Sequence, residues 1–473
     1  MIVKGDKKVI KGWVMYDWAN SVYSLVISSA IFPIFYEAQT TAAYSKKWGL
    51  SPDQLEANDV TVNFFGYNVS PSVLYSLVIS VSFMIVSFLS PILSGIADYT
   101  GNKKAFLKFF CYFGAFFCCT LFLFDANYME LSMLSVMLAS IGFWCSLVFY
   151  NAFLPEIAPL EEQDDISARG FIMGYIGSII LLVICLSMIM GVGAHLTKYS
   201  FILVGLWWVI FAQRTYRVLP INPYKKKPEA DYIWKGYREL KLVYKEFMHT
   251  TRLKKYLYAF FFFNSGVQTV MLLATIFASK AIEWPEGEGT TGLIIAILLI
   301  QIVAAFGAKI MSKISLKIGN ISTLKLSVFF WIMLCIGAYI ITKPIEFYIM
   351  AAGVGLVMGG IQSIARSTYS KYLPETTDHA SYFSFYDVSE KIGIVLGTAF
   401  FAFTEYYFDD IRYSVISIAI FFDLFFSYSI SIVYECPPKW SSFSNKSTLY
   451  FFDKKYAEDS PEIPEPITAI LIY

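Results

Sequence analysis

Residues 72–96 read SVLYSLVISVSFMIVSFLSPILSGI, 25 positions without a charged side chain. An α-helix needs about 20 mostly apolar residues to cross the hydrocarbon core of a bilayer, so this run is long enough to span it. Hydrocarbon offers no hydrogen-bond partners to an open backbone, and the run lacks the alternation of apolar and polar residues that is typical of a barrel strand. We therefore predict a membrane-spanning helix here.

The same composition extends over the whole chain of 473 residues. Apolar side chains make up 57% of it and charged ones only 15%, against roughly a quarter charged in soluble domains, which excludes a water-soluble globule. With residues 72–96, the apolar runs number twelve, six on each side of a polar middle, and we predict an all-α integral membrane protein with twelve transmembrane helices. The other runs lie at approximately 13–36, 105–124, 129–153, 169–194, 199–214, 257–280, 291–310, 324–341, 345–369, 383–403 and 414–434.

These runs divide the chain into four parts. We expect an N-terminal six-helix bundle over 1–214, a linker over 215–256, a C-terminal six-helix bundle over 257–434 and a tail over 435–473. The tail combines five prolines with acidic residues, so we assign it no regular structure. Residues 37–71 are expected to form one long outer loop.

Lysine and arginine are distributed unevenly between the two sides of the predicted helices. If both termini are cytoplasmic, all but six of the 37 basic residues lie on the inner side or at the inner ends of the helices. This bias follows the positive-inside rule and predicts cytoplasmic termini. The six exceptions are Lys46, Lys47, Lys198, Lys280, Lys343 and Arg412.

The linker contains an amphipathic pattern. Ile233, Tyr237, Leu240, Tyr244 and Phe247 recur at steps of four and three, with lysines around them. This spacing predicts a helix that lies along the inner membrane surface. The basic residues border helices where the positive-inside rule already expects them, so we do not expect a nucleic-acid partner.

Short segments of the first half recur in the second. Residues 150–156 read YNAFLPE and residues 369–375 read YSKYLPE, 219 positions later. The pair Asn20-Ser21 of the first span corresponds to the pair Asn264-Ser265 of the seventh, 244 positions later. Since these matches occur in the same order in both halves, they predict a duplication with two pseudo-symmetric bundles.

The turn that follows residues 72–96 places Gly95, Asp98 and Gly101 before the lysine pair Lys103 and Lys104. This spacing resembles the signature loop of the major facilitator superfamily. By that resemblance, these five residues would form a gate that closes the inner side between the two halves, against the eleventh span. The alternative is an ordinary turn that only sets topology.

The signature loop departs from the family pattern in two ways. Tyr99 stands where a basic residue is usual, and the second half has Leu316 where the counterpart of Asp98 would fall. The predicted gate is therefore not repeated in full in the second half.

Four further segments resemble one branch of that superfamily, the fungal vacuolar amino-acid effluxers of autophagy and their bacterial relatives. These segments are Tyr16–Ser21, Tyr150–Glu156, Arg169–Tyr175 and Phe385–Lys391. The resemblance implies two six-helix bundles around a central cavity that spans one, four, seven and ten line. It also implies export of amino acids, across the inner membrane of a bacterium or, in a eukaryote, across the vacuolar membrane. Many relatives would have an acid at Ser265, so its absence argues against a proton role there.

Polar side chains inside the first and seventh spans are candidate site residues, because a charged group in hydrocarbon costs several kcal/mol unless it faces water or a partner. Asp17 lies about four residues, or roughly 6 Å, inside the first span, and we consider a role in proton coupling or gating beside a structural ion pair. Asn20 and Tyr23 continue a polar stripe in the first span, and Asn264 and Gln268 form a similar one in the seventh. These residues are candidates for substrate binding, or else they bond neighbouring helices.

Arg366 is the deepest basic residue of a predicted cavity-lining span. It stands eight residues, or about 12 Å, before Pro374. With Gln362 one turn away, its guanidinium could hold a carboxylate of the substrate. The alternative is an internal ion pair with Glu390 or Asp387.

The eleventh span contains three charged residues within one turn. Asp387 and Lys391 stand at i and i+4 and can neutralise each other, which would leave Glu390 on another face. Glu390 is therefore our first candidate for a protonation site.

Together these patterns predict a secondary active transporter that moves a small polar solute by alternating access, with amino-acid export and proton coupling as expectations. An integral membrane enzyme and a non-transporting receptor or scaffold are the alternatives. The chain has no GxxxxGK[ST] motif, no CxxC spacing and only three scattered histidines, so we expect no ATP site, bound metal or cofactor. The expected partners are the bilayer, the solute and protons, and the chain is expected to be a monomer.

Overall fold

The computed structural model describes residues 4–49, 60–221, 231–408 and 410–435. Met1–Ile432 form one compact unit, to which the following description applies. The predicted tail, 435–473, lies outside the described residues except for its first position.

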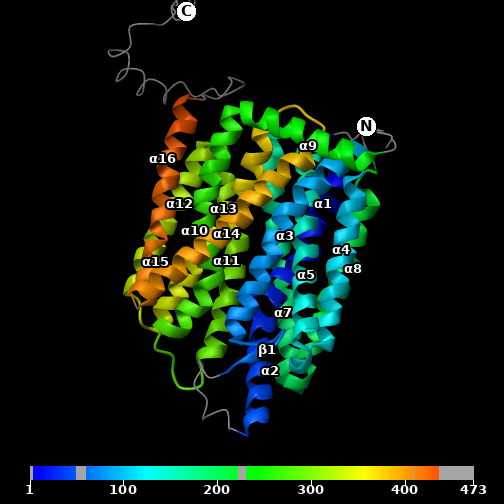
Figure 1. Ribbon diagram of the computed structural model, residues 1–473. Coiled ribbons are helices and arrows are strands. Elements are labelled where there is room, and N and C mark those ends of the chain that lie inside the picture. The colour runs from blue at the N-terminus through cyan, green and yellow to red at the C-terminus, as the bar shows by residue number, and fades with distance from the viewer. Residues whose placement is uncertain (1–3, 50–59, 222–230, 409, 436–473) are drawn as a thin grey trace, which may run out of the picture. The chain divides into compact units, whose positions relative to one another are not determined.

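Almost all of this unit is helical (Figure 1). The N-terminal helices are α1 (Lys7–Val22), a π-helical turn (Tyr23–Ala30), α2 (Ile31–Trp48), α3 (Pro71–Thr100), α4 (Lys103–Thr120), α5 (Met129–Asn151), α6 (Leu154–Ile157), α7 (Gln163–Val192) and α8 (Thr197–Val218). The linker contains α9 (Tyr232–His249). The C-terminal helices are α10 (Thr251–Ala281), α11 (Gly289–Ile318), α12 (Asn320–Ile340), α13 (Pro344–Tyr372), α14 (His379–Phe408), α15 (Ile411–Ser417) and α16 (Ala419–Glu435). Short 3-10 turns lie at Leu121–Leu123, Ala126–Tyr128, Leu160–Glu162 and Ala194–Leu196.

Eleven helical segments of the described chain are long and apolar enough to cross a membrane. Each coincides with a predicted run, and residues 72–96 fall within α3. The predicted run 383–403 falls within α14, which has 30 residues but is not among the eleven. That helix carries Asp387, Glu390 and Lys391 within five positions. The predicted number of twelve therefore depends on whether α14 also spans the membrane.

The expected outer loop over 37–71 is wrong in its first part, because α2 continues to Trp48. Residues 37–48 contain neither glycine nor proline, so nothing local ends the helix before Gly49, whose φ of 66° gives the left-handed cap typical of a helix end. Residues 50–59 are not described. Beyond them, β1 (Val62–Phe64) pairs antiparallel with β2 (Tyr67–Val69). This hairpin is a short addition to the predicted all-α architecture, which the described residues otherwise follow.

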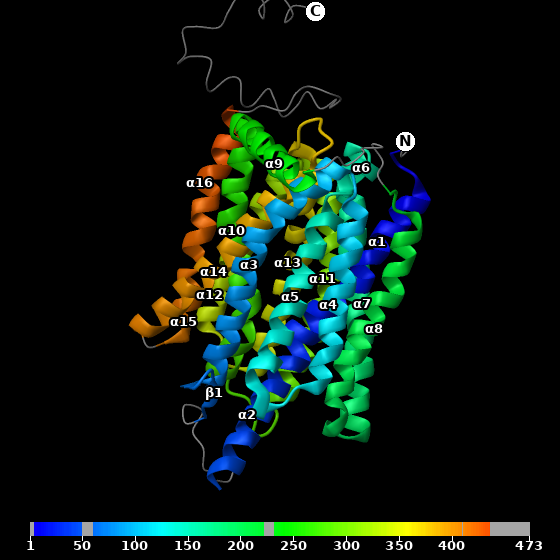
Figure 2. The ribbon, with the colours of Figure 1, turned by 45° about the vertical axis from the view of Figure 1, so that its right-hand side comes forward.

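The linker helix α9 is present, but the predicted apolar face is divided. Leu240 and Phe247 turn toward the other helices together with Gly236 and Val243, whereas Ile233, Tyr237 and Tyr244 remain exposed. The apolar stripe is broad enough to have two sides, of which only one packs on the protein. Figures 1 and 2 show α9 lying across one end of the helices, which we call the α9 end.

The helices before and after the linker pack largely among themselves. Among the N-terminal helices, α1 packs on α7 and α8, α4 packs on α5 and α8, and α3 packs on α5. Among the C-terminal helices, α10 packs on α14, and α13 packs on α11 and α12. The two sets meet where α3 contacts α14 and where α7 contacts α11 and α13.

Glycine permits the close contact between α11 and α13. A Cβ added at Gly355 would lie 2.5 Å from the carbonyl oxygen of Ile300, and one added at Gly359 would meet the carbonyl oxygen of Ala304. Side chains at these positions would force the helices apart, because small residues are what allow close backbone approach in membrane helices.

Two equivalent contacts occur in the two sets of helices. Ser21 of α1 faces Gly174 of α7, and Ser265 of α10 faces Gly393 of α14. The serines belong to the segments that the sequence matches across the two halves, and the glycines are 219 positions apart. The spacing of the glycines therefore equals that of residues 150–156 and 369–375.

Candidate functional site

Arg366 of α13 forms a buried ion pair with the other set of helices. Its Nη1 and Nη2 atoms lie 3.3 and 3.2 Å from Oδ2 of Asp17 on α1. The hydroxyl of Tyr150 on α5 donates a hydrogen bond of 2.7 Å to the same oxygen. Arg366 and Asp17 are 4% and 5% exposed. A desolvated pair of this kind is held by its complete set of partners, and removing one member leaves a buried charge.

The remaining donors of Arg366 also bind the N-terminal helices. Its Nε and Nη2 donate to the hydroxyl and carbonyl oxygens of Ser167 on α7, both at 2.9 Å. Its Nη1 donates to Oδ1 of Asn151 at 3.3 Å. Gly170 makes room for the pair, because a Cβ there would meet Asp17 Oδ2 and lie 2.9 Å from Arg366 Nη2. The guanidinium thus connects α13 to α1, α5 and α7.

These contacts correct one prediction about Arg366. The alternative prediction was an internal ion pair of Arg366 with Glu390 or Asp387. These partners were predicted wrongly, because the carboxylate that Arg366 binds is that of Asp17. Gln362 lies one turn away but bonds elsewhere: it accepts a hydrogen bond of 3.0 Å from the hydroxyl of Tyr175. That contact also joins α13 to α7.

A second charged cluster consists of Asp387, Glu390 and Lys391, which lie further along α14 from its start at His379. Lys391 Nζ is 2.8 Å from Asp387 Oδ1 and 2.9 Å from Glu390 Oε2, and it lies 3.6 Å from the ring centroid of Trp144 on α5. The side chain of Lys391 is fully buried and that of Glu390 is 16% exposed. Asp387 and Lys391 pair at i and i+4 as predicted, but Glu390 is not left apart from the pair, because the long lysine side chain reaches both carboxylates. One lysine shared by two carboxylates leaves a formal charge of −1.

Neighbouring polar groups extend this cluster. Gln268 of α10 donates to Glu390 Oε1 at 2.9 Å, and Ser90 of α3 donates to Asp387 Oδ2 at 3.4 Å. Gln268, predicted for substrate binding, thus lies beside Glu390, predicted for proton coupling. The cluster also joins the two sets of helices, through Ser90 and Trp144.

The predicted polar stripe of the first span is not continuous. Asn20 and Asn264 are both buried, and within the described chain neither side-chain amide nitrogen has a hydrogen-bond partner. Tyr23 instead packs inside the N-terminal helices, where its ring stacks on Phe143 at 4.6 Å between centroids. The structure therefore places the Tyr23 ring in an aromatic contact within the N-terminal helices.

The predicted gate residue Asp98 lies against the beginning of α14. Its Oδ2 accepts hydrogen bonds from the backbone N–H of Ser381 at 2.7 Å and from the Ser381 hydroxyl at 2.8 Å, and its Oδ1 accepts one from the N–H of Ala380 at 3.3 Å. A carboxylate at the N-terminus of a helix satisfies free N–H groups and opposes the positive end of the helix dipole. The eleventh predicted span is thus the element that this acid contacts.

The other signature residues make separate contacts around this turn. Lys103 lies 3.7 Å from Asp98 and forms a close ion pair with Glu156, which also contacts His379 of α14. Lys104 donates to the carbonyl oxygen of Leu219 at 2.7 Å. Gly101 has a φ of 71° and caps α3, a conformation that glycine adopts without strain, while Gly95 contacts α9.

A second acid at the α9 end was missed by the sequence analysis. Asp164 of α7 accepts hydrogen bonds from Lys371 of α13 at 2.6 Å, Ser315 of α11 at 3.0 Å and Asn320 of α12 at 2.8 Å. The second half has Leu316 where the counterpart of Asp98 would fall. The acid that binds the C-terminal helices at this end, Asp164, comes instead from the N-terminal set. Asp164 stands in an acidic run at a helix start, a pattern that ordinary helix capping also explains.

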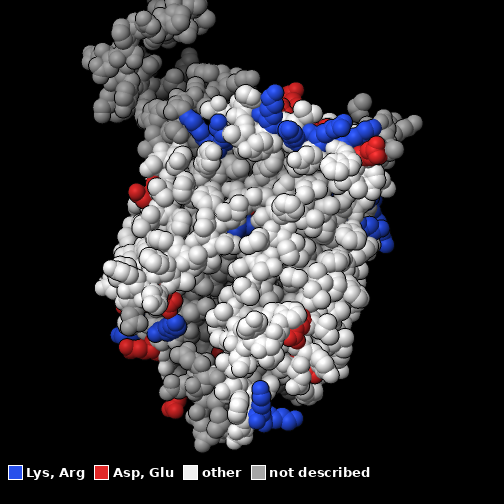
Figure 3. Space-filling model, viewed as in Figure 1, with Lys and Arg blue, Asp and Glu red and all other residues white. Residues whose placement is uncertain are grey.

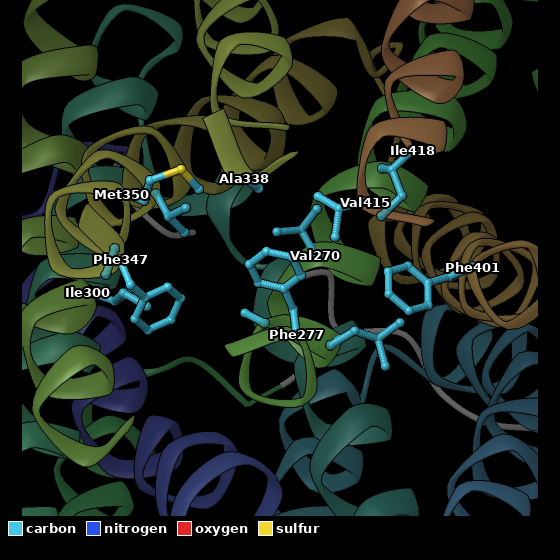
Figure 4. Close-up of a pocket in the computed structure, with 13 residues that line it drawn as sticks. Val270, Phe277, Ile300, Ala338, Phe347, Met350, Phe401, Val415 and Ile418 are labelled. Carbon is cyan, nitrogen blue, oxygen red and sulfur yellow. The ribbon is translucent and has the colours of Figure 1, made fainter. Parts of the chain in front are cut away.

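A small apolar cavity of about 50 Å³ lies among the C-terminal helices (Figure 4). Val270 and Phe277 of α10, Ile300 of α11 and Phe401 of α14 point into it. It has no polar lining residue, so it offers a polar solute no hydrogen bond.

Comparison with other proteins places the chain among transporters. The family model described as vacuole effluxer Atg22 like matches residues 5–433. The MFS-type transporter YxiO of Bacillus subtilis (strain 168) is 31% identical over 412 residues, which cover 85% of this chain and 90% of that protein. Autophagy-related protein 22 of Coccidioides immitis (strain RS) is 24% identical over 495 aligned residues, which cover 83% of this chain and 81% of that protein.

Solved structures show the same fold. The major facilitator superfamily transporter FucP in its outward conformation matches with a TM-score of 0.61 at 12% identity, covering 90% of this chain and 99% of that one. A bacterial homologue of the iron transporter ferroportin in an outward-facing state matches with a TM-score of 0.58 at 11% identity, covering 90% and 100%. The chain therefore belongs to the vacuole effluxer Atg22-like branch of the major facilitator superfamily and is a multi-pass membrane transporter.

Proposed function

We propose that this protein is a secondary transporter of amino acids that works by alternating access. Helices α1–α8 and α10–α16 act as two bundles of six membrane spans each, with α14 as the eleventh span. The α9 end faces the cytoplasm, in keeping with the positive-inside rule. The contacts of Arg366, Asp98 and Asp164 all join the two sets of helices near that end, so the state described is closed on the cytoplasmic side.

One observation carries this proposal: the hydrogen bonds of Arg366 described here all go to the other set of helices. If the bundles separate, the guanidinium of Arg366 loses its contacts with Asp17, Ser167 and Asn151 at the same time. An unpartnered buried charge is costly, so opening is favoured when another carboxylate replaces Asp17. A carboxylate of the solute can do this through the planar fork of donors that arginine presents.

The second cluster supplies the complementary charge. Glu390 and Asp387 share one lysine, which leaves one negative charge for the amino group of the solute or for a proton. If Glu390 takes up a proton, a neutral pair of Lys391 and Asp387 remains. We therefore propose proton coupling through Glu390, with Asp17 as a second candidate. Export out of the vacuole, toward the cytoplasmic side, is the direction proposed for a vacuolar membrane, since the family is described as vacuole effluxers.

The substrate class can be tested by counterflow in proteoliposomes. Vesicles preloaded with one unlabelled amino acid should take up the same labelled amino acid, whereas its amide and its decarboxylated amine should give no counterflow because they lack the carboxylate. Counterflow of the amine equal to that of the amino acid would contradict carboxylate recognition. No counterflow with any amino acid would remove the proposed substrate class.

A further inference from the structure

Helix α9 is fastened to α3 by a close backbone contact. A Cβ added at Gly236 would lie 2.7 Å from Cα of Ile96, and one added at Gly95 would lie 2.5 Å from the carbonyl oxygen of Gly236. Leu240 and Val243 continue the packed side of α9 along the same face. Contact at this distance needs glycine on both helices, which fixes where α9 crosses α3.

The same helix also reaches the C-terminal set. The rings of Tyr244 and Phe247 lie 6.0 and 5.3 Å from the ring of Phe385 on α14. The chain continues from α9 directly into α10. Helix α9 therefore bridges α3 and α14, the two helices joined by Asp98 and Ser381 at the cytoplasmic gate.

The outer side of α9 combines exposed apolar and basic side chains. Trp234 is 68% exposed and Leu242 64% exposed, although both are large and apolar. Arg238, Lys241 and Lys245 are exposed on the same helix. Figure 3 shows Lys and Arg side chains in a row along the α9 end, above a body that is mostly free of charge. This combination is typical of a helix that lies in the interface of an anionic membrane.

We propose that α9 binds anionic phospholipid headgroups of the adjacent leaflet through Arg238, Lys241 and Lys245, with Trp234 and Leu242 inserted among the acyl chains. Since α9 bridges α3 and α14, lipid binding holds these helices together and stabilises the closed cytoplasmic gate. The gating part of this inference depends on the proposed transport cycle, whereas the lipid binding itself does not. Each basic residue near an anionic surface strengthens binding about fivefold.

Hydrogen–deuterium exchange of the full chain in nanodiscs tests both parts. One set of nanodiscs contains phosphatidylcholine alone, and the other contains phosphatidylcholine mixed with phosphatidylglycerol. Amides of residues 232–249 should exchange at least about tenfold more slowly with the anionic lipid. The N–H groups of Ala380 and Ser381, which bond Asp98, should also gain protection.

The triple variant Arg238→Gln, Lys241→Gln, Lys245→Gln should lose this lipid dependence. The double variant Lys46→Gln, Lys47→Gln removes exposed charge at the opposite end and should keep it. Equal exchange of α9 in the two lipids would overturn lipid binding, even if counterflow of amino acids is normal. Protection of α9 without added protection at Ala380 and Ser381 would overturn its role in holding the gate. Protection by soluble anionic polymers but not by anionic lipid would show a different kind of partner.

Discussion

Arg366 illustrates how one side chain can serve two purposes in a membrane protein. In the structure it is neutralised by Asp17, and its other donors bind Ser167 and Asn151. The sequence indicates that a charge at this depth must have a partner. It does not identify the partner, because Asp17 is 349 positions away and the pairing depends on which helices meet. In the proposed transport cycle, the same side chain would become available to a solute when the helices part.

The ion pair predicts a specific pattern of variant stabilities. Arg366→Ala should lower the stability of the protein by about 3–5 kcal/mol and abolish flux, because Asp17 is left as an unpartnered buried charge. The double variant Asp17→Asn, Arg366→Gln should recover most of the thermal stability without recovering flux. Arg366→Lys should also fail to transport, since lysine lacks the planar fork. Thermal unfolding and counterflow measure both effects, and wild-type flux in the double variant would contradict a transport role for the pair.

Glu390 allows a separate prediction about coupling. Glu390→Gln should abolish the dependence of uptake on a pH gradient while counterflow persists, because the amide cannot take up the proton. Its single oxygen can still accept from Lys391, and its NH2 group can donate to the amide oxygen of Gln268 once that amide turns over. Glu405, which pairs with the half-exposed Lys280, provides the matched control, and Glu405→Gln should keep the coupling. Uptake driven equally by a pH gradient in wild type and Glu390→Gln would exclude Glu390 as the proton carrier.

At the scale of the helices, hydropathy predicts well where each helix lies in the sequence. It predicts poorly which helices contact each other. The run 72–96 lies within α3, since apolar length is a local property of the chain. The outer loop was misplaced because residues 37–48 are good helix formers outside hydrocarbon. Asp164 was missed because acids at the start of a helix have an ordinary local explanation, and its partners come from three other helices. The hairpin of β1 and β2 is too short to give a clear sequence signal.

Helix α7 provides a test of close packing at the site. Gly170→Ala should disturb the ion pair, because the added Cβ would meet Asp17 Oδ2 and Arg366 Nη2, and we expect a loss of about 1–3 kcal/mol with a marked fall in flux. Gly191 stands near the other end of α7, with nothing within 4 Å of an added Cβ. Gly191→Ala should be neutral or stabilising by up to about 1 kcal/mol. Equal effects of the two substitutions on melting temperature and flux would contradict this account of Gly170.

At the scale of the whole molecule, the two halves are related without being identical. Ser21 with Gly174 and Ser265 with Gly393 are equivalent contacts, as a duplicated transporter would have. The acids that join the two sets at the α9 end differ. Asp98 of α3 contacts the start of α14, whereas Asp164 of α7 contacts α11, α12 and α13. The sequence could predict the first from its motif. The contacts of Asp164 could not be predicted in this way, because they depend on α7 and α11 lying side by side in the fold.

The central claim is that these acids hold the cytoplasmic side closed, and the distance between the two sets of helices measures it directly. Spin labels at the exposed positions Lys108 of α4 and Lys317 of α11 report that distance by electron–electron double resonance. Each acid contributes hydrogen bonds worth about 1–3 kcal/mol, so the double variant Asp98→Asn, Asp164→Asn should populate a longer distance that is absent from the wild type. The exposed Glu161→Gln should not. Identical distance distributions in the wild type and the double variant would contradict the claim.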